Sequence, residues 1–259
     1  LTFDDALSVH LDVAMPMLEK HGFRGTFFVP LGDESFTRRL CDWQEAAARG
    51  HELGNHSILH AAVSGKSYVS EGNAIENYTA DRMRLELEAA NRILAGIDGQ
   101  DVRTFAYPCC NPVLGRPGLA KRSLRTLGLN RTRLMGMVLG HPWLDLGSRE
   151  RSYEPVAEAL FVAARTGGER YAAGADYPPP RAAVPSVSLD GATPEGIPAV
   201  LDAFEREDSA WLVFMVHGIG GGHRLSCARD VFARLLAEIA ARTMAVCTFR
   251  DAALTVYEG

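Results

Sequence analysis

Short apolar runs recur along the chain, and each one ends in polar residues or in glycine or proline. Runs of this length with such boundaries predict β-strands. The strands expected on this basis are Leu1–Phe3, Gly25–Val29, His51–Gly54, Thr104–Tyr107, Trp211–Val216 and Ala245–Phe249.

Longer segments with apolar residues at helical spacing alternate with these runs. The spacing predicts amphipathic helices over Val9–His21, Thr37–Arg49, Asp81–Leu94 and Ala228–Arg242. In the third helix, which Gly96 is expected to end, the apolar side should consist of Met83, Leu85, Leu87, Ile93 and Leu94. In the fourth helix, it should consist of Val231, Phe232, Leu235, Leu236 and Ile239. The pattern is weaker between residues 111 and 196, where two further helices are expected over Gly118–Leu127 and Tyr153–Ala164.

The alternation of strands and helices predicts parallel βα units in an α/β fold. We expect a single domain over residues 1–259, because no internal repeat and no long linker divides the chain. In barrels built of such units, functional residues collect where strands end and loops begin. Residues suited to chemistry lie at or just after predicted strand ends, namely Asp4, Asp5, His56, Tyr107 and His217. We therefore expect these residues to form one site.

The composition is that of a globular domain, with 47 % hydrophobic residues. Its 27 basic residues against 32 acidic ones give a net charge of −5, which argues against a nucleic-acid partner. No apolar run approaches the roughly 20 residues that a membrane span requires. Because the chain opens on Leu1, inside a predicted strand, we expect this first strand to be truncated at the N-terminus.

The chain has five cysteines, an odd number without a CxxC pair. This pattern disfavours a zinc knuckle and a dense disulfide framework. Buried free thiols and one or two disulfides in an exported protein are both compatible with it.

Two histidines and two aspartates suggest a metal site. His56 and His60 are four residues apart, and residues at this spacing on a helical turn face the same way, so both imidazoles can bind one ion. Aspartate and histidine ligands suit a divalent cation such as Zn²⁺. Each pair considered alone has an explanation without a metal: the histidines could belong to a polar turn, and Asp4 and Asp5 could cap a helix.

Four motifs together resemble a known family. They are Thr2-Phe3-Asp4-Asp5, His56-Ser57-Ile58-Leu59-His60, Phe105-Ala106-Tyr107-Pro108-Cys109 and Val216-His217-Gly218. In order and approximate spacing they resemble the polysaccharide deacetylases with a NodB homology domain, which form carbohydrate esterase family 4. Ala6 stands where glycine usually follows the first motif.

The resemblance implies a distorted (β/α)7-type barrel, with fewer βα units than the eightfold form. It implies Asp5, His56 and His60 as ligands of one divalent metal ion. Zn²⁺ is the expected ion, with Co²⁺ or Ni²⁺ as alternatives. The resemblance also implies Asp4 as general base and His217 as general acid.

The third motif implies the oxyanion and substrate contacts, from Tyr107, Pro108 and the backbone N–H of Cys109. The implied substrate is an acetylated carbohydrate that loses N- or O-linked acetyl groups, as in an acetyl xylan esterase. Glycan-processing members are usually exported, so a secreted, periplasmic or cell-surface location is implied.

Two structural demands accompany these roles. Adjacent side chains on a strand point in opposite directions, so the first strand must end or turn at Asp4 and Asp5 if both are to serve one site. Many family members also carry an arginine that steadies the catalytic aspartate at the position of Ala106. Another cation should then pair with Asp4, and Arg165 is our candidate because it ends an apolar run, with Arg131 and Arg133 as alternatives.

Two other functions fit the same motifs. A hydrolase of small linear or cyclic amides would keep the fold and the metal. A carbohydrate-binding protein without catalysis is the second, suggested by Ala106 and by the Cys109-Cys110 pair.

Overall fold

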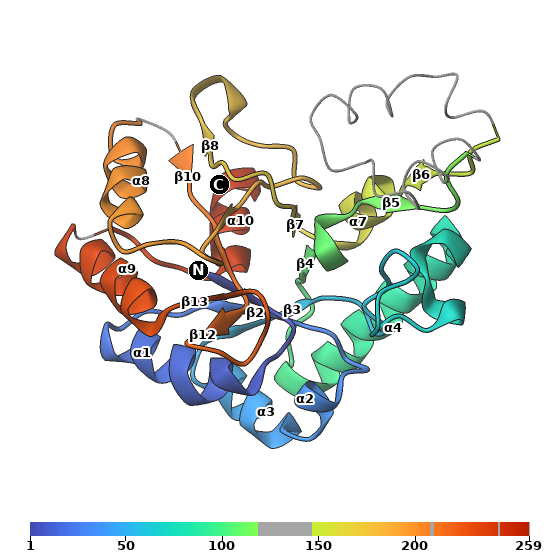
Figure 1. Ribbon diagram of the computed structural model, residues 1–259, viewed down its shortest axis with the longest axis horizontal. Helices are drawn as coiled ribbons and strands as arrows, with labels where there is room; N and C mark the ends of the chain where they lie inside the picture. The colour runs from blue at the N-terminus through green and yellow to red at the C-terminus, as the bar shows by residue number, and fades with distance from the viewer. Residues whose placement is uncertain (119–146, 208–209, 243, 259) are drawn as a thin grey trace.

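A seven-stranded parallel sheet forms the centre of the computed structural model, which describes residues 1–118, 147–207, 210–242 and 244–258 (Figure 1). The spatial order of the strands is β7-β4-β3-β2-β1-β11-β9. In chain order they are β1 (Thr2–Asp4), β2 (Thr26–Val29), β3 (Glu52–Asn55), β4 (Thr104–Ala106), β7 (Ala163–Arg165), β9 (Val187–Ser188) and β11 (Phe214–Val216). The sheet curls into part of a barrel, and the predicted α/β fold of the distorted (β/α)7 type is confirmed.

Helices surround the curled sheet on its outer side (Figure 1). The α-helices of the described residues are α1 (Met15–Lys20), preceded by a π-helical turn (His10–Ala14), α2 (Glu34–Thr37), α3 (Leu40–Ala48), α4 (Ala80–Asp98), α7 (Glu154–Leu160), α8 (Gly196–Phe204), α9 (Arg229–Ala241) and α10 (Phe249–Glu258), of which α10 lies at one end of the sheet. Short strands pair outside the main sheet: β5 (Val113–Leu114) with β6 (Arg151–Ser152), β8 (Ala172–Ala173) with β10 (Ala210–Trp211), and β12 (Gly218–Ile219) with β13 (Ser226–Cys227). None of the helices in the described ranges is long and apolar enough to span a bilayer.

Alternate strand residues serve two separate cores, because successive side chains point to opposite faces of the sheet. Phe27 packs outward against Trp43 of α3, in a cluster that also includes Leu235 of α9. The neighbouring Phe28 points inward and packs against Phe249 of α10. A side chain at Gly54 on the adjacent strand would place its Cβ 2.4 Å from the Phe28 ring, so only glycine fits there.

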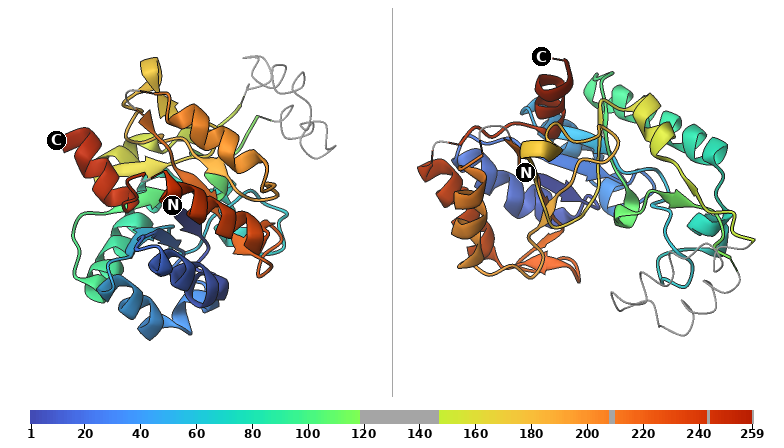
Figure 2. Two further views of the ribbon diagram at one scale, coloured as in Figure 1. Left: turned by 90° about the vertical axis from the view of Figure 1, so that its left-hand side faces the viewer. Right: turned by 90° about the horizontal axis from the view of Figure 1, so that it is seen from above.

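Helix α10 lies at the amino ends of the strands, where it closes one end of the barrel (Figure 2, red). The buried Glu52 carboxylate, at the start of β3, accepts hydrogen bonds from the hydroxyls of Thr26 and Thr104 and from the backbone N–H of Arg250. The Thr26 hydroxyl also accepts the N–H of Phe249, at 2.7 Å. A buried polar cluster therefore ties the first turn of α10 to three strands.

Helix α4 differs from the prediction in its end and in its buried side. It continues through Gly96 to Asp98 and ends at Gly99, which adopts the left-handed conformation with φ of 71°. Leu85 and Ile93, expected on the apolar side, are 66 % and 47 % exposed. The 3.6-residue period selects another set, because the buried residues are Met83, Leu87, Ala90 and Leu94.

Four other predicted elements need correction or lie outside the description. Trp211–Val216 is not one strand, because β10 ends at Trp211 and pairs with β8, whereas β11 begins at Phe214 in the main sheet. Ala245–Phe249 is not a strand, because α10 begins at Phe249 and residues 244–248 pair with no strand of the described chain. The helix expected over Tyr153–Ala164 ends at Leu160, and Ala163 already belongs to β7. From residue 119 onward, the helix expected over Gly118–Leu127 lies outside the described residues.

All five cysteines lie in the described ranges and are free thiols. Among them, only Cys227 is buried, whereas Cys41, Cys109 and Cys247 are exposed. The expectation of free thiols is thus met, and the expectation of burial holds for Cys227 alone.

Candidate active site

Asp4 and Asp5 lie where β1 ends, at the carboxyl edge of the sheet. Asp4 is the last residue of the strand, and Asp5 turns the chain with φ of 77°. This left-handed conformation is uncommon for residues other than glycine, although aspartate tolerates it better than most. The turn meets the demand stated from the sequence, because it lets two adjacent carboxylates face the same region.

His56 and His60 follow β3 on a turn rather than on the helix that their spacing suggested. Ser57 and His60 have positive φ values of 65° and 46°. The Asn55 side chain accepts the N–H of Ser57 at 2.7 Å, and the Ser57 hydroxyl accepts the N–H of His60 at 3.0 Å. This local network brings the two imidazole rings to 4.8 Å between centroids.

Asp5, His56 and His60 converge on one point. The Asp5 Oδ1 lies 3.6 Å from Nε2 of His56 and 3.2 Å from Nε2 of His60. One ligand atom from each residue lies within 4.8 Å of the other two. These atoms are close enough to share one cation, and within the described ranges no other group of histidine, cysteine and acidic residues meets this criterion.

Neighbouring groups orient this cluster. The Nδ1 of His56 lies 2.8 Å from the carbonyl oxygen of Ala106, so it carries the proton in the neutral ring and leaves Nε2 with a free lone pair. Glu86 of α4 accepts the backbone N–H groups of Ile58 and Leu59 at 3.1 Å and 2.9 Å. Sequence reasoning missed Glu86, because nothing local marks it as different from other helix glutamates.

The charge on Asp5 is strongly favoured in this setting. Burial acts to raise the pKa of Asp5, but the interactions of its carboxylate with the His56 and His60 imidazoles outweigh burial and hold the pKa well below its usual range. Asp5 is therefore an anion that two imidazoles face, and a carboxylate with two imidazoles is a donor set typical of zinc.

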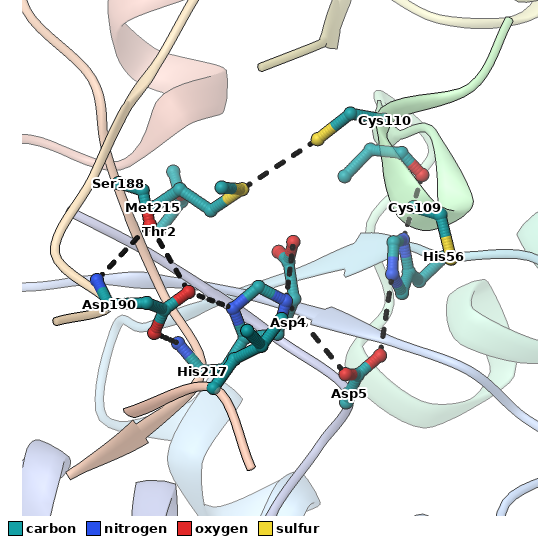
Figure 3. Close-up of polar contacts among 12 residues, drawn as sticks. Thr2, Asp4, Asp5, His56, Cys109, Cys110, Ser188, Asp190, Met215 and His217 are labelled. Atoms are coloured by element: carbon teal, nitrogen blue, oxygen red, sulfur yellow. Dashed lines mark hydrogen bonds and ion pairs between the residues drawn. The ribbon is translucent and has the colours of Figure 1, made fainter. Parts of the chain in front are cut away.

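Asp4 has a different partner, the guanidinium of Arg165 on β7 (Figure 3 shows Asp4 beside Asp5 and His217). Asp4 is 3 % exposed and Arg165 is fully buried, so the ion pair crosses the interior of the barrel. Arg165 pairs in register with Ala106 of β4 and lies over the Phe28 ring, at 5.3 Å. The cation expected to pair with Asp4 is thus Arg165, on the strand adjacent to Ala106.

Only one oxygen of Asp4 is engaged. Oδ2 binds Arg165, whereas Oδ1 is buried and has no hydrogen-bond partner among the described residues. Burial acts to raise the pKa of Asp4, but the charge of Arg165 holds it below its usual value. The alternatives Arg131 and Arg133 lie outside the described residues.

His217 follows β11 and faces both aspartates. Its Nε2 lies 4.0 Å from Oδ2 of Asp4 and 4.0 Å from Oδ2 of Asp5. Its Nδ1 lies 2.6 Å from Oδ2 of Asp190 (Figure 3). Burial acts to lower the pKa of His217, but the bond to Asp190 and the charges of Asp4, Asp190 and Asp5 raise it above its usual value.

Sequence reasoning missed two partners of His217. Asp190 follows the run Val187-Ser188-Leu189, and a carboxylate two residues after a short strand was the available signal. The second partner is His10, whose Nε2 lies 2.8 Å from the carbonyl oxygen of His217. Burial lowers the pKa of His10 to about 4, so its ring is neutral at pH 7 and donates from Nε2.

The third motif forms a tight turn after β4, over Pro108–Cys110. The Tyr107 side chain points away from the aspartates, because its hydroxyl donates to the carbonyl of Ala182 at 2.9 Å and its ring packs on Tyr153. Pro108 is buried, and Cys109 adopts φ of 53° with an exposed thiol. Tyr107 therefore contributes to the turn through its backbone rather than through a side chain directed at a substrate.

The fold and these strand-end residues define a class, the parallel (β/α)7 half-barrels with their polar site at the carboxyl edge of the sheet. The family described as "Polysaccharide deacetylase" matches residues 1–115 of the chain. This match includes the first three of the four motifs and confirms the resemblance expected from them. No curated protein matches the chain in sequence.

The fold of this chain is similar to that of several solved structures. One is a family 4 acetyl xylan esterase from Clostridium thermocellum with a cobalt ion, at 15 % identity and a TM-score of 0.52, covering 98 % of this chain and 88 % of that one. A peptidoglycan N-acetylglucosamine deacetylase has 16 % identity and a TM-score of 0.53, with coverage of 99 % and 86 %.

A third structure is a carbohydrate esterase family 4 pseudoenzyme from Bacillus anthracis, with 15 % identity and a TM-score of 0.52. The match covers 97 % of this chain but 63 % of that protein, so this chain spans less than two thirds of its length. At these identities the likeness shows the fold. The three structures are described as an acetyl xylan esterase, a peptidoglycan N-acetylglucosamine deacetylase and a pseudoenzyme, so they do not select a substrate.

Proposed function

We propose that this protein is a metal-dependent hydrolase that removes N- or O-linked acetyl groups from a polysaccharide or oligosaccharide. One observation carries the proposal. Asp5, His56 and His60 converge within 4.8 Å of one another, and Asp4 and His217 flank them at the same edge of the sheet. The match of residues 1–115 to the polysaccharide deacetylases supports the same reaction.

The donor set fits a divalent cation. A buried anionic carboxylate and two imidazoles, one of them with its Nε2 lone pair free, are ligands suited to Zn²⁺, and Co²⁺ or Ni²⁺ can take the same donors. A divalent ion held by these residues would supply Lewis acidity and lower the pKa of water from about 15.7 to about 7.

Asp4 is suited to act as the general base. Arg165 holds one of its oxygens, which fixes the carboxylate and keeps it ionised. The other oxygen, Oδ1, has no partner among the described residues and is free to accept a proton from the attacking water. The arrangement separates the two oxygens into an anchored one and a reactive one.

His217 is suited to act as the general acid. Asp190 orients the ring through Nδ1 and favours its protonated form, so Nε2 carries a proton toward the site. The leaving amine or alkoxide of the sugar requires such a proton when the acetyl group departs. The backbone N–H of Cys109, on the tight turn after β4, is proposed to donate to the carbonyl oxygen of the acetyl group.

The same proposal covers the whole chain as one polysaccharide deacetylase domain, over residues 1–259, in an exported protein. The non-catalytic alternative drew support from Ala106, because the expected arginine is missing there. Arg165 provides a guanidinium to Asp4, so this departure no longer favours a binding protein over an enzyme.

Acetate release tests the proposal. The metal-free protein, and the same protein with added Zn²⁺, Co²⁺ or Ni²⁺, should be assayed on acetylated xylan, chitooligosaccharides, peptidoglycan and a small acetyl ester. We expect metal-dependent acetate release from at least one glycan. Release of ammonia or amine from small amides, with none of the glycans hydrolysed, would favour the amide hydrolase. Glycan binding without any hydrolysis would favour the binding protein.

A further inference from the structure

Three side chains form a wall beside the metal cluster, and the roles proposed above use none of them. Lys66 Nζ and the Tyr68 hydroxyl each lie 3.4 Å from the Sγ of Cys109. Lys66 Nζ also lies 5.5 Å from the centroid of the Tyr68 ring. These contacts tie the loop after the His56–His60 turn to the tight turn after β4, and we call the three residues the Lys66–Tyr68–Cys109 wall.

The wall adjoins the site itself. The Tyr68 ring centroid lies 5.9 Å from that of His60, whose Nε2 faces Asp5. Tyr68 is nevertheless 58 % exposed, which is unusual for a large aromatic side chain held by several contacts. An exposed ring next to a hydrolytic centre offers a flat apolar surface on which a sugar ring can stack.

Lys66 has no carboxylate partner among the described residues, in contrast to several exposed arginines. Arg39, Arg170 and Arg242 each contact a carboxylate within 3.0 Å. Across the described parts of the chain, no carboxylate lies within 4.0 Å of the Lys66 ammonium, whose polar contacts are Tyr68 and Cys109. The positive charge is therefore available to an anionic group on a ligand.

We propose that the Lys66–Tyr68–Cys109 wall binds a carboxylate-bearing sugar next to the acetylated one. This inference rests on the proposed function and adds a substrate class, an acidic glycan. The neighbouring sugar stacks on Tyr68, and its carboxylate, on a uronic acid or a lactyl ether, pairs with the Lys66 ammonium. Cys109 holds both side chains in place and keeps the wall attached to the turn that contributes the oxyanion donor.

Oligosaccharide binding tests the inference without depending on turnover. Calorimetry should compare two acetylated oligosaccharides, a glucuronic acid-substituted xylan fragment and a muramic acid-containing glycan fragment, each before and after reduction of its carboxyl group to an alcohol. The wild-type protein is expected to bind at least one carboxylate form about 3- to 10-fold more tightly than its reduced form. Equal affinity for both forms of both glycans would overturn the inference.

Matched variants assign the preference to the wall. Lys66→Gln should abolish the preference and Lys66→Arg should retain it, whereas Lys20→Gln, an exposed lysine at the end of α1, should leave it unchanged. Tyr68→Ala should weaken the binding of both the carboxylate and the reduced oligosaccharide about 3- to 10-fold, and Tyr68→Phe should retain most of the affinity. If Lys66→Gln kept the full preference for the carboxylate form, the assignment of this preference to Lys66 would be wrong.

Acetate release, measured in parallel, separates the two proposals. If acetate is released and the carboxylate preference is absent, the proposed function stands and the acidic subsite is wrong. If the preference is present and disappears in Lys66→Gln but no acetate is released, the subsite stands and the hydrolase is wrong.

Discussion

Asp4 and Asp5 are identical neighbours in sequence, and their surroundings give them different chemistry. Asp4 faces a buried guanidinium and keeps one oxygen without a partner in the described chain, whereas Asp5 faces two imidazoles. Two carboxylates in different environments commonly divide roles in a hydrolytic site. Here the backbone turn at Asp5 produces the division, because it directs the two side chains to different partners.

The first residue-scale prediction concerns this division. Asp4→Asn should lower the rate of acetate release by roughly 10²–10⁴-fold, because the amide cannot accept the proton of the attacking water. The variant should still bind one Zn²⁺ per chain, since Asp4 is not a proposed ligand. Acetate assays and metal analysis of the same sample check this, and a rate near that of the wild type would refute Asp4 as the base.

The second prediction concerns the pH dependence of His217. The hydrogen bond from His217 to Asp190 raises the pKa of the imidazole, so Asp190→Asn should lower that pKa. A general acid acts while it is protonated, and the alkaline limb of kcat/KM should therefore move to lower pH in the variant. An unchanged pH profile, in a variant that retains activity, would show that Asp190 does not act on the acid.

At the scale of elements, the loop after β3 depends on a residue from α4. Glu86 accepts the backbone N–H groups of Ile58 and Leu59 and also the Tyr78 hydroxyl, at 2.7 Å. The loop that carries both histidines is thereby held from outside the site. Groups of this kind, which orient ligands without touching the metal, typically change metal affinity when they are removed.

Glu86→Ala should accordingly weaken Zn²⁺ binding by about 10- to 100-fold. Glu88→Ala is the matched control, because Glu88 lies on the same helix and, among the described residues, its carboxylate pairs with the exposed Arg92 side chain alone, at 3.9 Å. Competition with a chelator of known affinity measures the difference. Equal Zn²⁺ affinity in the two variants would mean that the loop holds its shape without Glu86.

A second element-scale prediction concerns the attachment of α10. Burial raises the pKa of Glu52 above its reference value of 4.5, although hydrogen bonds from Thr104 and Thr26 act against this. Between these two pKa values, Glu52 keeps its proton in the folded state and releases it in the unfolded chain. The contribution of this protonated carboxyl group to stability is complete below about pH 4.5 and is lost as the pH rises through the higher pKa of the folded state.

Glu52→Gln should remove this pH dependence. The stability of the variant relative to the wild type should rise as the pH increases from about 4.5 toward neutrality, because the wild type must then ionise a buried carboxyl group. Urea unfolding at several pH values measures the difference. A constant difference across this range would show that the carboxyl group titrates alike in both states.

At the scale of the molecule, the sequence predicted the α/β barrel and most central strands, because short buried runs and polar strand ends are local signals. It failed at Ala245–Phe249, where a strand-like composition lies beside a helix start that Thr26 and Glu52 fix from afar. It also extended the helix after Tyr153 into β7, because alanine-rich segments such as Ala163–Arg165 lack a distinctive period.

The candidate site likewise contains residues that the sequence identified and residues that it missed. Asp5, His56 and His60 stand in recognisable motifs, and the structure brings them together, although on a turn whose positive φ values no helical spacing suggests. Asp190, His10 and Glu86 act through contacts between residues far apart in the chain. The position of Asp190 after a short strand was a weak signal, and no local pattern marks His10 or Glu86. Arg165 could be predicted from the sequence only because the absence of an arginine at the position of Ala106 required another cation for Asp4.

The most direct test of the account relates acetate release to bound metal. Metal-free protein should be titrated with Zn²⁺ while acetate release from the best glycan substrate and bound zinc are measured together. We predict that release is absent without metal, rises in proportion to bound zinc and levels off at one ion per chain, with no rise in an Asp5→Ala, His60→Ala double variant. Acetate release that is independent of bound zinc, or that persists in the double variant, would contradict the account.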